Sequence, residues 1–305
     1  MLRLRVPAAG LTTIAALLAS GCGGGDDSAS DERSQGATTP SATLRNASPN
    51  AGVEDPLRAA PPRARRLAIT VRDAGEGDFR YSAPRTAPAG LVEIRLRNAG
   101  EVPRKAQLWR IDGDHTVREA LDVRRPLPDW LTTAGGVGLT APGQTGRSLQ
   151  RLRPGRYYVA GTGDQPGRVA SFRVEGRAAS QPLPAAPARV DALDFRFEVA
   201  GLTTGRNTIE FRNTGAEPHH AFFVPMTAGA TLDDVRGFFT SRSSVGPPPV
   251  DAERTRETVV IEGGDRQITE LELDAGRYAV VCFVRNRSGG PPHIEFGMLN
   301  ELTVR

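Results

Sequence analysis

A cysteine, a methionine and histidines in the C-terminal part of the chain could together bind a soft metal ion. Cys282, His293 and Met298 form a Cys-x10-His-x4-Met string, and the adjacent pair His219 and His220 lies earlier in the chain. A thiolate, two imidazoles and a thioether suit copper, which takes two histidines and a cysteine in a trigonal plane with a weak axial methionine. Zinc more often has a fuller set of cysteine and histidine ligands. The donor types therefore predict a copper site.

Only one of the two adjacent histidines should face the metal, because neighbouring side chains of a strand point to opposite faces. The position directly after Pro218 favours His219 as the ligand. His220 is expected to lie behind the ligands or at the surface, although it could also serve an external ligand. The sequence alone does not decide between the two.

The chain begins with features of an exported lipoprotein. Two arginines, an apolar stretch and small residues precede Cys22, as in a secretory signal peptide covering residues 1–21. The stretch Leu18-Ala-Ser-Gly-Cys22 resembles the lipobox of bacterial lipoproteins, which implies a lipid on Cys22. Residues 22–65 are rich in Gly, Ser, Asp, Ala and Pro, and are predicted to form a disordered tether. We therefore expect a membrane-anchored protein on the extracytoplasmic, periplasmic face of the cell membrane, where Cys282 is the remaining thiol.

The rest of the chain contains an internal duplication. Residues 66–175 and 189–305 carry the same order of short strand-like runs, separated by a Pro/Ala linker at 176–188. Both halves contain an Asn-x-Gly turn before a strand and a Gly-Arg-Tyr strand near their end. The matched segments are 97–103 with 212–218, and 154–159 with 275–280.

Many short strands with Gly/Pro turns predict an all-β protein with two tandem β-sandwiches. Helical signals are few: Thr231 to Phe239 opens with an N-cap threonine and acidic residues, and Val117 to Val123 is its counterpart in the first half. A Greek-key sandwich can bring a strand start in mid-domain and the end of a later strand together at one end. The candidate ligands come from two such places.

Residues Asn213 to Phe223 and Gly276 to Val304 resemble a cupredoxin, the type 1 blue-copper fold. In that family an Asn-x-Gly…Pro-His segment introduces the first ligand, and a Tyr-x-x-x-Cys…His-x4-Met string supplies the others. The resemblance implies two Greek-key cupredoxin-like sandwiches and one type 1 copper that passes single electrons. The ligands that it implies are His219, Cys282, His293 and Met298.

The ten-residue segment between Cys282 and His293 departs from small electron carriers such as plastocyanin and is closer to multidomain cupredoxins such as copper nitrite reductases. A longer loop could loosen the site, or bring a protein partner's surface to it. The first half has Arg104, Lys105 and Gly161 at the positions of His219, His220 and Cys282. It is expected to be a degenerate copy that holds no metal and serves a structural or partner-binding role.

The histidine count restricts catalytic chemistry. Nitrite reductases and multicopper oxidases need further copper ions held by several more histidines, and this chain has four in all. Only His115, expected in a solvated loop, and His220 remain, so we do not expect an enzyme of either kind unless another subunit contributes ligands. Two cysteines exclude a disulfide framework and, with Cys22 lipidated, a dinuclear copper site. No hydrolase or phosphate-loop motif is present.

The formal net charge of +4 is small for 305 residues, and the basic residues are scattered, so nucleic-acid binding is not expected. The expected partners are the membrane, through the N-terminal lipid, and an unidentified redox or binding protein. One alternative remains open from the sequence. The sandwiches could form a binding module for a protein, a glycan or a copper ion for delivery, with the four residues kept but no redox turnover.

Overall fold

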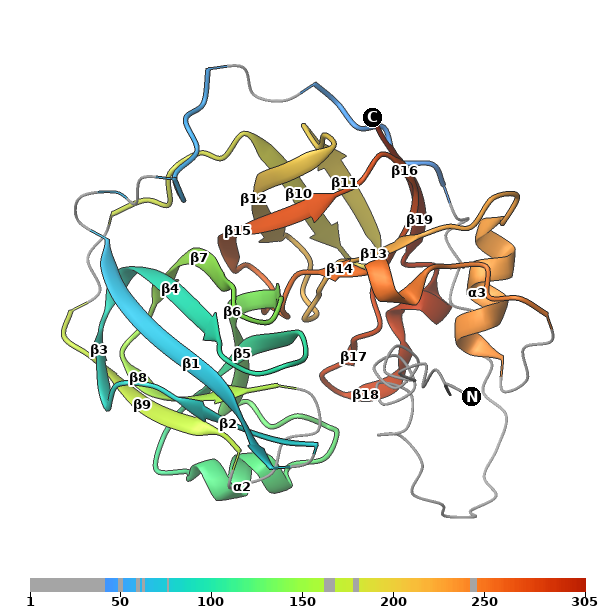
Figure 1. Cartoon of the computed structure of the whole chain (residues 1–305). Coiled ribbons are helices and arrows are strands. Elements are labelled where there is room, and N and C mark those ends of the chain that lie inside the picture. The colour runs from blue at the N-terminus through green and yellow to red at the C-terminus, as the bar shows by residue number, and fades with distance from the viewer. Residues whose placement is uncertain are drawn as a thin grey trace, which may run out of the picture.

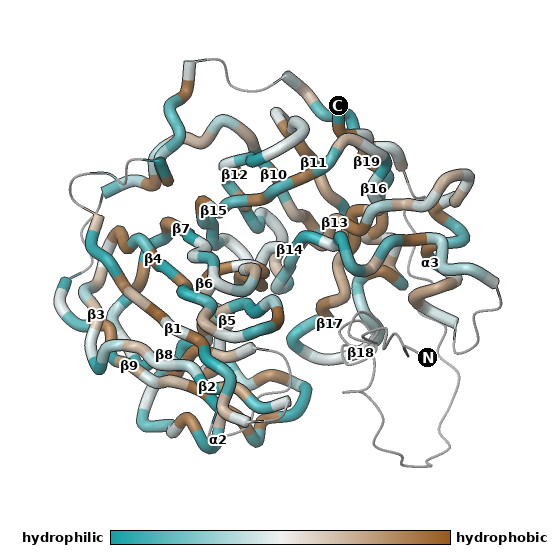
Figure 2. Tube along the Cα trace, in the orientation of Figure 1, coloured by the Kyte–Doolittle hydropathy of each residue, from teal (hydrophilic) through white to brown (hydrophobic). Residues whose placement is uncertain are grey.

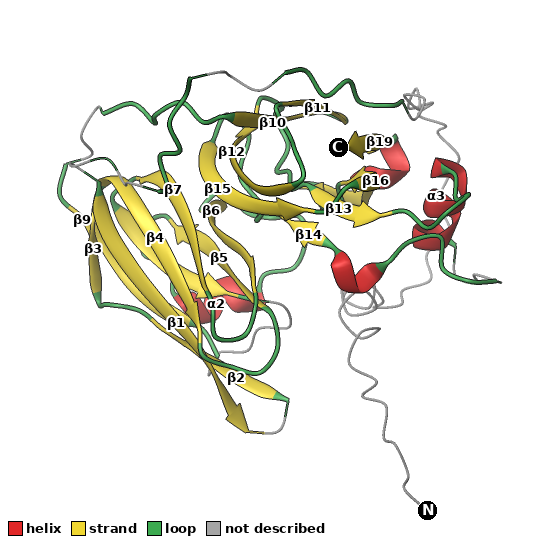
Figure 3. Cartoon of the chain, turned by 45° about the horizontal axis from the view of Figure 1, so that its top comes forward, coloured by secondary structure: helices red, strands yellow, loops and turns green. Residues whose placement is uncertain are grey.

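The computed structural model describes residues 42–48, 52–58, 61, 64–75, 77–161, 168–177, 181–241 and 246–305. The predicted signal peptide, Cys22 and most of the predicted tether lie outside these residues. The regular secondary structure of the described chain is mostly β-strand, with few and short helices (Figure 3).

The first domain is a sandwich in which β1 pairs in parallel with β4, and β7 and β2 extend the same sheet. The second sheet has the order β3-β9-β8-β5-β6. The strands are β1 (Arg65–Gly75), β2 (Asp78–Ser82), β3 (Thr86–Pro88), β4 (Gly90–Asn98), β5 (Arg104–Ile111), β6 (Leu131–Thr140), β7 (Thr145–Leu152), β8 (Gly155–Ala160) and β9 (Ala170–Glu175).

The second domain repeats this plan. Its β10 pairs in parallel with β12, and β11 and β15 complete that sheet, while the facing sheet has the order β14-β13-β16-β19. The strands are β10 (Ala188–Leu193), β11 (Arg196–Ala200), β12 (Gly205–Asn213), β13 (Phe222–Pro225), β14 (Arg256–Glu257), β15 (Arg266–Leu273), β16 (Gly276–Val281), β17 (Arg285–Asn286), β18 (Gly289–Pro292) and β19 (Leu299–Val304). The prediction of an all-β protein with two tandem β-sandwiches and few, short helices is confirmed.

The two domains share one sheet. Strand β7 of the first domain pairs antiparallel with β15 of the second, with Leu149 opposite Ile268 and Ser148 opposite Thr269. The result is an eight-stranded sheet that runs through both domains, which meet side by side at these strands (Figure 1). Main-chain hydrogen bonds therefore fix the second domain relative to the first.

Period-2 alternation builds both cores. In β1 the side chains of Leu67, Ile69 and Val71 are buried between more exposed neighbours. In the second domain Phe211 and Val280 are fully buried in the corresponding core. Figure 2 shows apolar residues recurring along the strands of both domains. Alternation of this kind lets each sheet bury one face against its partner.

Helix α2 (Val117–Asp122) and helix α3 (Leu232–Thr240) form where the sequence predicts them. Thr116 and Thr231 cap their N-termini, and each cap is part of a capping box with the acidic residue three positions on. No helix among the described residues has the length and apolar character needed to cross a membrane.

Part of the predicted tether is packed against the domains, so the prediction of disorder through residue 65 is wrong for 42–48 and 52–58. The Leu44 N–H donates to the Glu301 carbonyl at 2.6 Å, and Asn46 exchanges two hydrogen bonds with the backbone of Leu202. Leu57 is 1% exposed and packs in a cluster that includes Leu149 and Ile268. The composition is too polar to form a core of its own, but one leucine can fill an apolar face that the shared sheet leaves uncovered.

We expect Leu57→Ala to lower the free energy of unfolding by about 2–5 kcal/mol, because it leaves a cavity over the shared sheet. The control is Leu139→Ala, whose side chain is 37% exposed and whose loss should change stability by less than about 0.5 kcal/mol. Urea denaturation measures both. Equal stability of the two variants would show that residues 52–58 do not contribute to the fold.

Candidate metal centre

The candidate ligands meet at one end of the second sandwich. His219 lies just before β13, and its backbone forms an isolated bridge with Ile261. Cys282 directly follows β16, and His293 begins a short 3-10 helix, η2 (His293–Phe296). The sequence predicted His219 at the start of a strand, Cys282 at the end of a strand and His293 in a loop. His219 and Cys282 do lie beside strand ends, whereas His293 lies on the 3-10 helix.

The donor atoms of three predicted ligands converge. Cys282 Sγ lies 3.7 Å from His219 Nδ1 and 3.5 Å from His293 Nδ1, and the two Nδ1 atoms are 3.0 Å apart. All three side chains are 0% exposed. First-row metal ions bind nitrogen at about 2.0 Å and sulfur at about 2.3 Å. Two donor atoms bound to one ion therefore lie roughly 3–4 Å from each other, as these three do.

Hydrogen bonds on the far side fix both imidazoles. His219 Nε2 lies 2.7 Å from Asp194 Oδ1, and His293 Nε2 lies 2.9 Å from Asn286 Oδ1. Both partners are acceptor oxygens, so the single N–H of each neutral imidazole is on Nε2. Both Nδ1 atoms then carry lone pairs that face each other and the cysteine sulfur. Such an arrangement fits a cation among the three donors, and a set of two imidazole nitrogens and one thiolate sulfur fits copper.

Asp194 is held ionised by its surroundings. Burial raises the pKa of its carboxyl group, but hydrogen bonds from the Ala216 N–H, from His219 and from the Glu217 N–H outweigh this and leave the pKa below its usual value. The Ala216 N–H donates to Asp194 Oδ2 at 2.8 Å. A charged acceptor therefore orients the His219 ring.

Met298, the fourth predicted ligand, is fully buried in the same cluster as Cys282. Its N–H donates to the His293 carbonyl at 3.0 Å, and its carbonyl accepts from the Cys282 N–H at 3.2 Å. The backbone thus ties Met298 to both Cys282 and His293.

The cysteine sulfur lies in a dry environment. Burial raises the pKa of Cys282 to about 12, although the backbone N–H groups of His220 and Val284 are directed at it and favour the thiolate. His220 is 4% exposed, and its Nε2 accepts a hydrogen bond from the Phe283 N–H at 2.9 Å. His220 is therefore a buried residue behind Cys282, and the surface position considered from the sequence is wrong.

Aromatic rings cover the imidazoles. The ring of Phe195 packs edge-on at 4.8 Å from the ring of His293, and stacks at 4.8 Å on Phe296. Phe195 also approaches the His219 ring at 6.2 Å. These rings exclude water from the donor atoms.

The first domain fills the corresponding place with charge. Asp73 occupies the position of Asp194, accepts from the Glu101 N–H at 2.8 Å, and lies 3.9 Å from Arg104, which replaces His219. The Arg104 guanidinium stacks over Phe79 at 4.0 Å. The duplication kept the carboxylate and its turn and exchanged the imidazole for a guanidinium, which cannot bind a cation.

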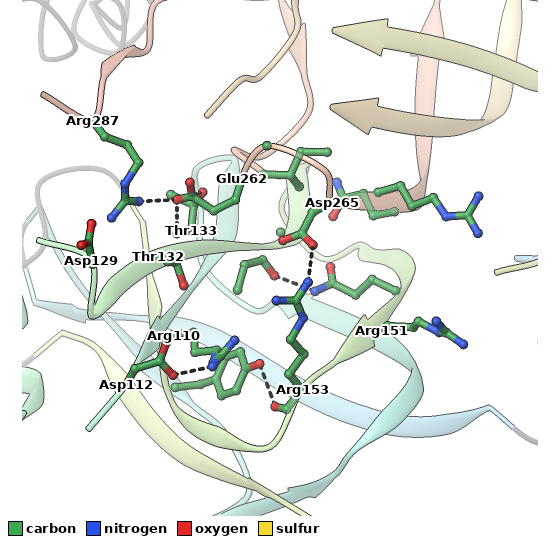
Figure 4. A pocket seen from close by; sticks show the side chains of 18 residues that line it. Arg110, Asp112, Asp129, Thr132, Thr133, Arg151, Arg153, Glu262, Asp265 and Arg287 are labelled. Atoms are coloured by element: carbon green, nitrogen blue, oxygen red, sulfur yellow. Dashed lines mark hydrogen bonds and ion pairs between the residues drawn. The ribbon is translucent and has the colours of Figure 1, made fainter. Parts of the chain in front are cut away.

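A polar pocket of about 380 Å³ lies where the domains meet (Figure 4). Three ion pairs lie among its lining residues: Arg110 with Asp112, Arg153 with Asp265, and Arg287 with Glu262. His115, predicted in a solvated loop, lies apart from the metal centre and stacks on Trp130 at 4.0 Å. Asp194 and Asn286 could not be recognised as site residues from the sequence, because an isolated Asp or Asn beside a turn is common in any chain.

No family model matches the chain, and no curated protein matches it. Solved structures similar to it include a multicopper oxidase, with 16% identity over 81% of this chain and 92% of the other, at a TM-score of 0.22. Reduced auracyanin from the photosynthetic bacterium Roseiflexus castenholzii matches at 21% identity over 38% of this chain and 94% of its own, at a TM-score of 0.25. A Cu-containing nitrite reductase from Thermus scotoductus has 12% identity over 79% of this chain and 62% of its own, with a TM-score of 0.21. At these identities the comparisons assign no activity.

The buried imidazoles predict acid sensitivity of the copper-free protein. Burial lowers the pKa of His293 to about 3, lowers that of His219, and places that of His220 well below 6.5. Below pH 6.5 the unfolded chain therefore binds protons that the folded chain does not, and stability falls as the pH falls. The slope is about 1.4 kcal/mol per pH unit for each such imidazole.

Urea denaturation between pH 7.5 and 5.5 checks this slope. In His220→Gln the slope should be shallower, because one buried imidazole is removed. The fold should be kept, because the glutamine oxygen can still accept a hydrogen bond from the Phe283 N–H. A free energy of unfolding that is constant over this range would contradict the burial of the imidazoles.

Asp194→Ala should weaken copper binding about 10- to 100-fold, because the His219 ring loses the acceptor that orients it. The matched control is Asp73→Ala, which removes the equivalent carboxylate from the first domain and should leave copper binding unchanged. Competition titration with a chromophoric chelator measures both. Equal affinities for the two variants would remove Asp194 from the metal centre.

Proposed function

We propose that this protein is an exported, lipid-anchored single-electron carrier with one type 1 copper in its second domain. The proposed ligands are His219, Cys282, His293 and Met298. The observation that carries the proposal is the buried convergence of one cysteine sulfur and two imidazole nitrogens. The outer nitrogens of the two rings are already hydrogen-bonded to Asp194 and Asn286.

A copper ion bound there would carry one electron by alternating between Cu(II) and Cu(I). The protein's part is to hold the donors in one arrangement and to keep water away. The imidazoles are fixed from behind by Asp194 and Asn286, and the Met298 backbone is tied to both Cys282 and His293. A site held this firmly changes little when its charge changes, which favours rapid electron transfer.

A carrier is favoured over a copper oxidase by the positions of the other two histidines. His115 packs on Trp130 in the first domain, and His220 accepts from the backbone behind Cys282. Among the described residues, the cluster of His219, Cys282 and His293 is the one that brings three potential metal ligands together. Export and the lipid on Cys22 are proposed from the N-terminal sequence, as is an extracytoplasmic redox partner.

Titration of the metal-free protein with Cu(II) tests the proposal. We expect an intense blue absorption band that saturates at one copper per chain, because a buried thiolate bonds the metal. Cys282→Ser should remove the band and keep the fold, whereas the control His115→Gln should keep both. A colourless wild-type protein would favour the binding-module alternative, and an unchanged spectrum in Cys282→Ser would exclude the proposed ligand set.

A further inference from the structure

We propose that the first domain, although it holds no metal ligands, positions both imidazoles of the metal centre, and that Arg287 is its main point of attachment. The inference rests on the proposed function, since it assigns a role in the same copper site. It is carried by two separate sets of contacts that cross from the first domain to the two histidines.

The first set holds the segment between Cys282 and His293. This segment folds as the hairpin β17–β18, which extends toward the first domain (Figure 1). Arg125 Nη1 donates to the Asn286 carbonyl at 2.6 Å, and the Leu127 N–H donates to the Arg287 carbonyl at 2.8 Å. The Asn286 side chain is the acceptor for His293 Nε2. The first domain therefore binds the backbone of Asn286, whose side chain orients the second imidazole, and the backbone of its neighbour Arg287.

Arg287, which lies between β17 and β18, bonds to the first domain through its side chain. Its Nη2 donates to the carbonyls of Pro128 at 2.8 Å and Leu131 at 3.0 Å in the first domain. Its Nη1 lies 3.0 Å from Glu262, and its own N–H donates to Glu217 at 2.7 Å. The guanidinium is largely buried, so these bonds are shielded from solvent and from salt. Figure 4 shows Arg287 reaching Glu262 beside Thr133.

The second set holds His219. Its backbone exchanges two hydrogen bonds with Ile261, which on its other side forms a bridge with Ala134 of β6. The neighbouring Val260 is bound by the Gln107 side chain, which accepts from its N–H at 2.7 Å and donates to its carbonyl at 2.9 Å. Glu262 accepts from both the N–H and the hydroxyl of Thr133. The segment 260–262 is thus held between the first domain and the first imidazole.

Arg287 joins the two sets, because its guanidinium binds the first domain and Glu262 at once. Without it, the carbonyls of Pro128 and Leu131 lose this donor, and Glu262 keeps only Thr133 of these partners. The hairpin then has fewer bonds to the first domain. Asn286 would then sample more than one position, and the His293 ring with it. The longer Cys-to-His segment does not loosen the site, because the first domain supplies the constraint.

The test compares Arg287→Ala with two matched controls in the full chain. Arg285→Ala removes an arginine of the same hairpin that bonds within the hairpin, to the Gly290 carbonyl. Arg153→Ala breaks an exposed ion pair between the domains, with Asp265, that does not contact the hairpin. In copper-free protein we measure by NMR the exchange rate of the His293 Nε2 proton. In copper-loaded protein we measure the rate of copper loss to a chelator and the EPR spectrum.

Arg287→Ala should speed exchange of the His293 Nε2 proton and copper loss by about 10-fold or more, and should broaden the EPR hyperfine lines. Both controls should match the wild type. Wild-type behaviour of Arg287→Ala, or equal effects in Arg153→Ala, would overturn the inference. If Arg287→Ala does not fold, Arg125→Ala is compared with the same controls under the same criteria.

Failure of the proposed function is distinguishable from failure of this inference. A wild-type chain that takes up no copper would refute the copper site, whereas the proton exchange measured without metal still shows whether the first domain holds the His293 ring.

Discussion

The structure depends on one costly arrangement: two imidazole nitrogens and a cysteine sulfur face one another in a fully buried site. The two Nδ1 atoms are 3.0 Å apart, and the N–H of each ring is bound to an oxygen on its far side. Buried polar atoms that lack partners destabilise a fold, so the surrounding residues must supply every other bond. Asp194, Asn286 and the Met298 backbone do so, and a bound cation would satisfy the remaining lone pairs.

The duplication produced two copies of one fold that use equivalent positions differently. Each copy places a carboxylate behind the Asn-x-Gly turn, Asp73 in the first domain and Asp194 in the second. In the first copy that carboxylate faces Arg104, and the position after it, Lys105, forms a mostly buried ion pair with Glu257 of the second domain. The position of the candidate ligand His219 thus carries an ion pair within the first domain, and the position of His220 carries a bond between the domains.

The sequence was sufficient for the fold class, the duplication and the gathering of His219, Cys282 and His293, because alternation, matched turns and unusual donor types are local signals. It could not reveal Asp194 or Asn286, since their role depends on a ring brought close by tertiary structure. It also misjudged residues 42–48 and 52–58, where Leu57 is buried although its neighbours are polar. The composition of a segment indicates whether it can form a core of its own. It does not indicate whether an apolar surface elsewhere in the chain can bury one of its side chains.

The ten residues between Cys282 and His293 show why the length of a loop is a poor guide to its freedom. The entropic cost of closing a loop rises slowly with its length, so a longer connection is tolerated if its interior is ordered. Here the interior is a hairpin whose backbone bonds to Arg125 and Leu127, and whose Arg287 bonds back to the first domain. A short loop constrains its ends through its own stiffness, whereas this one is constrained by a neighbour. The rigidity of the metal centre is therefore a property of the two-domain unit, and the shared sheet between β7 and β15 is what keeps that neighbour in place.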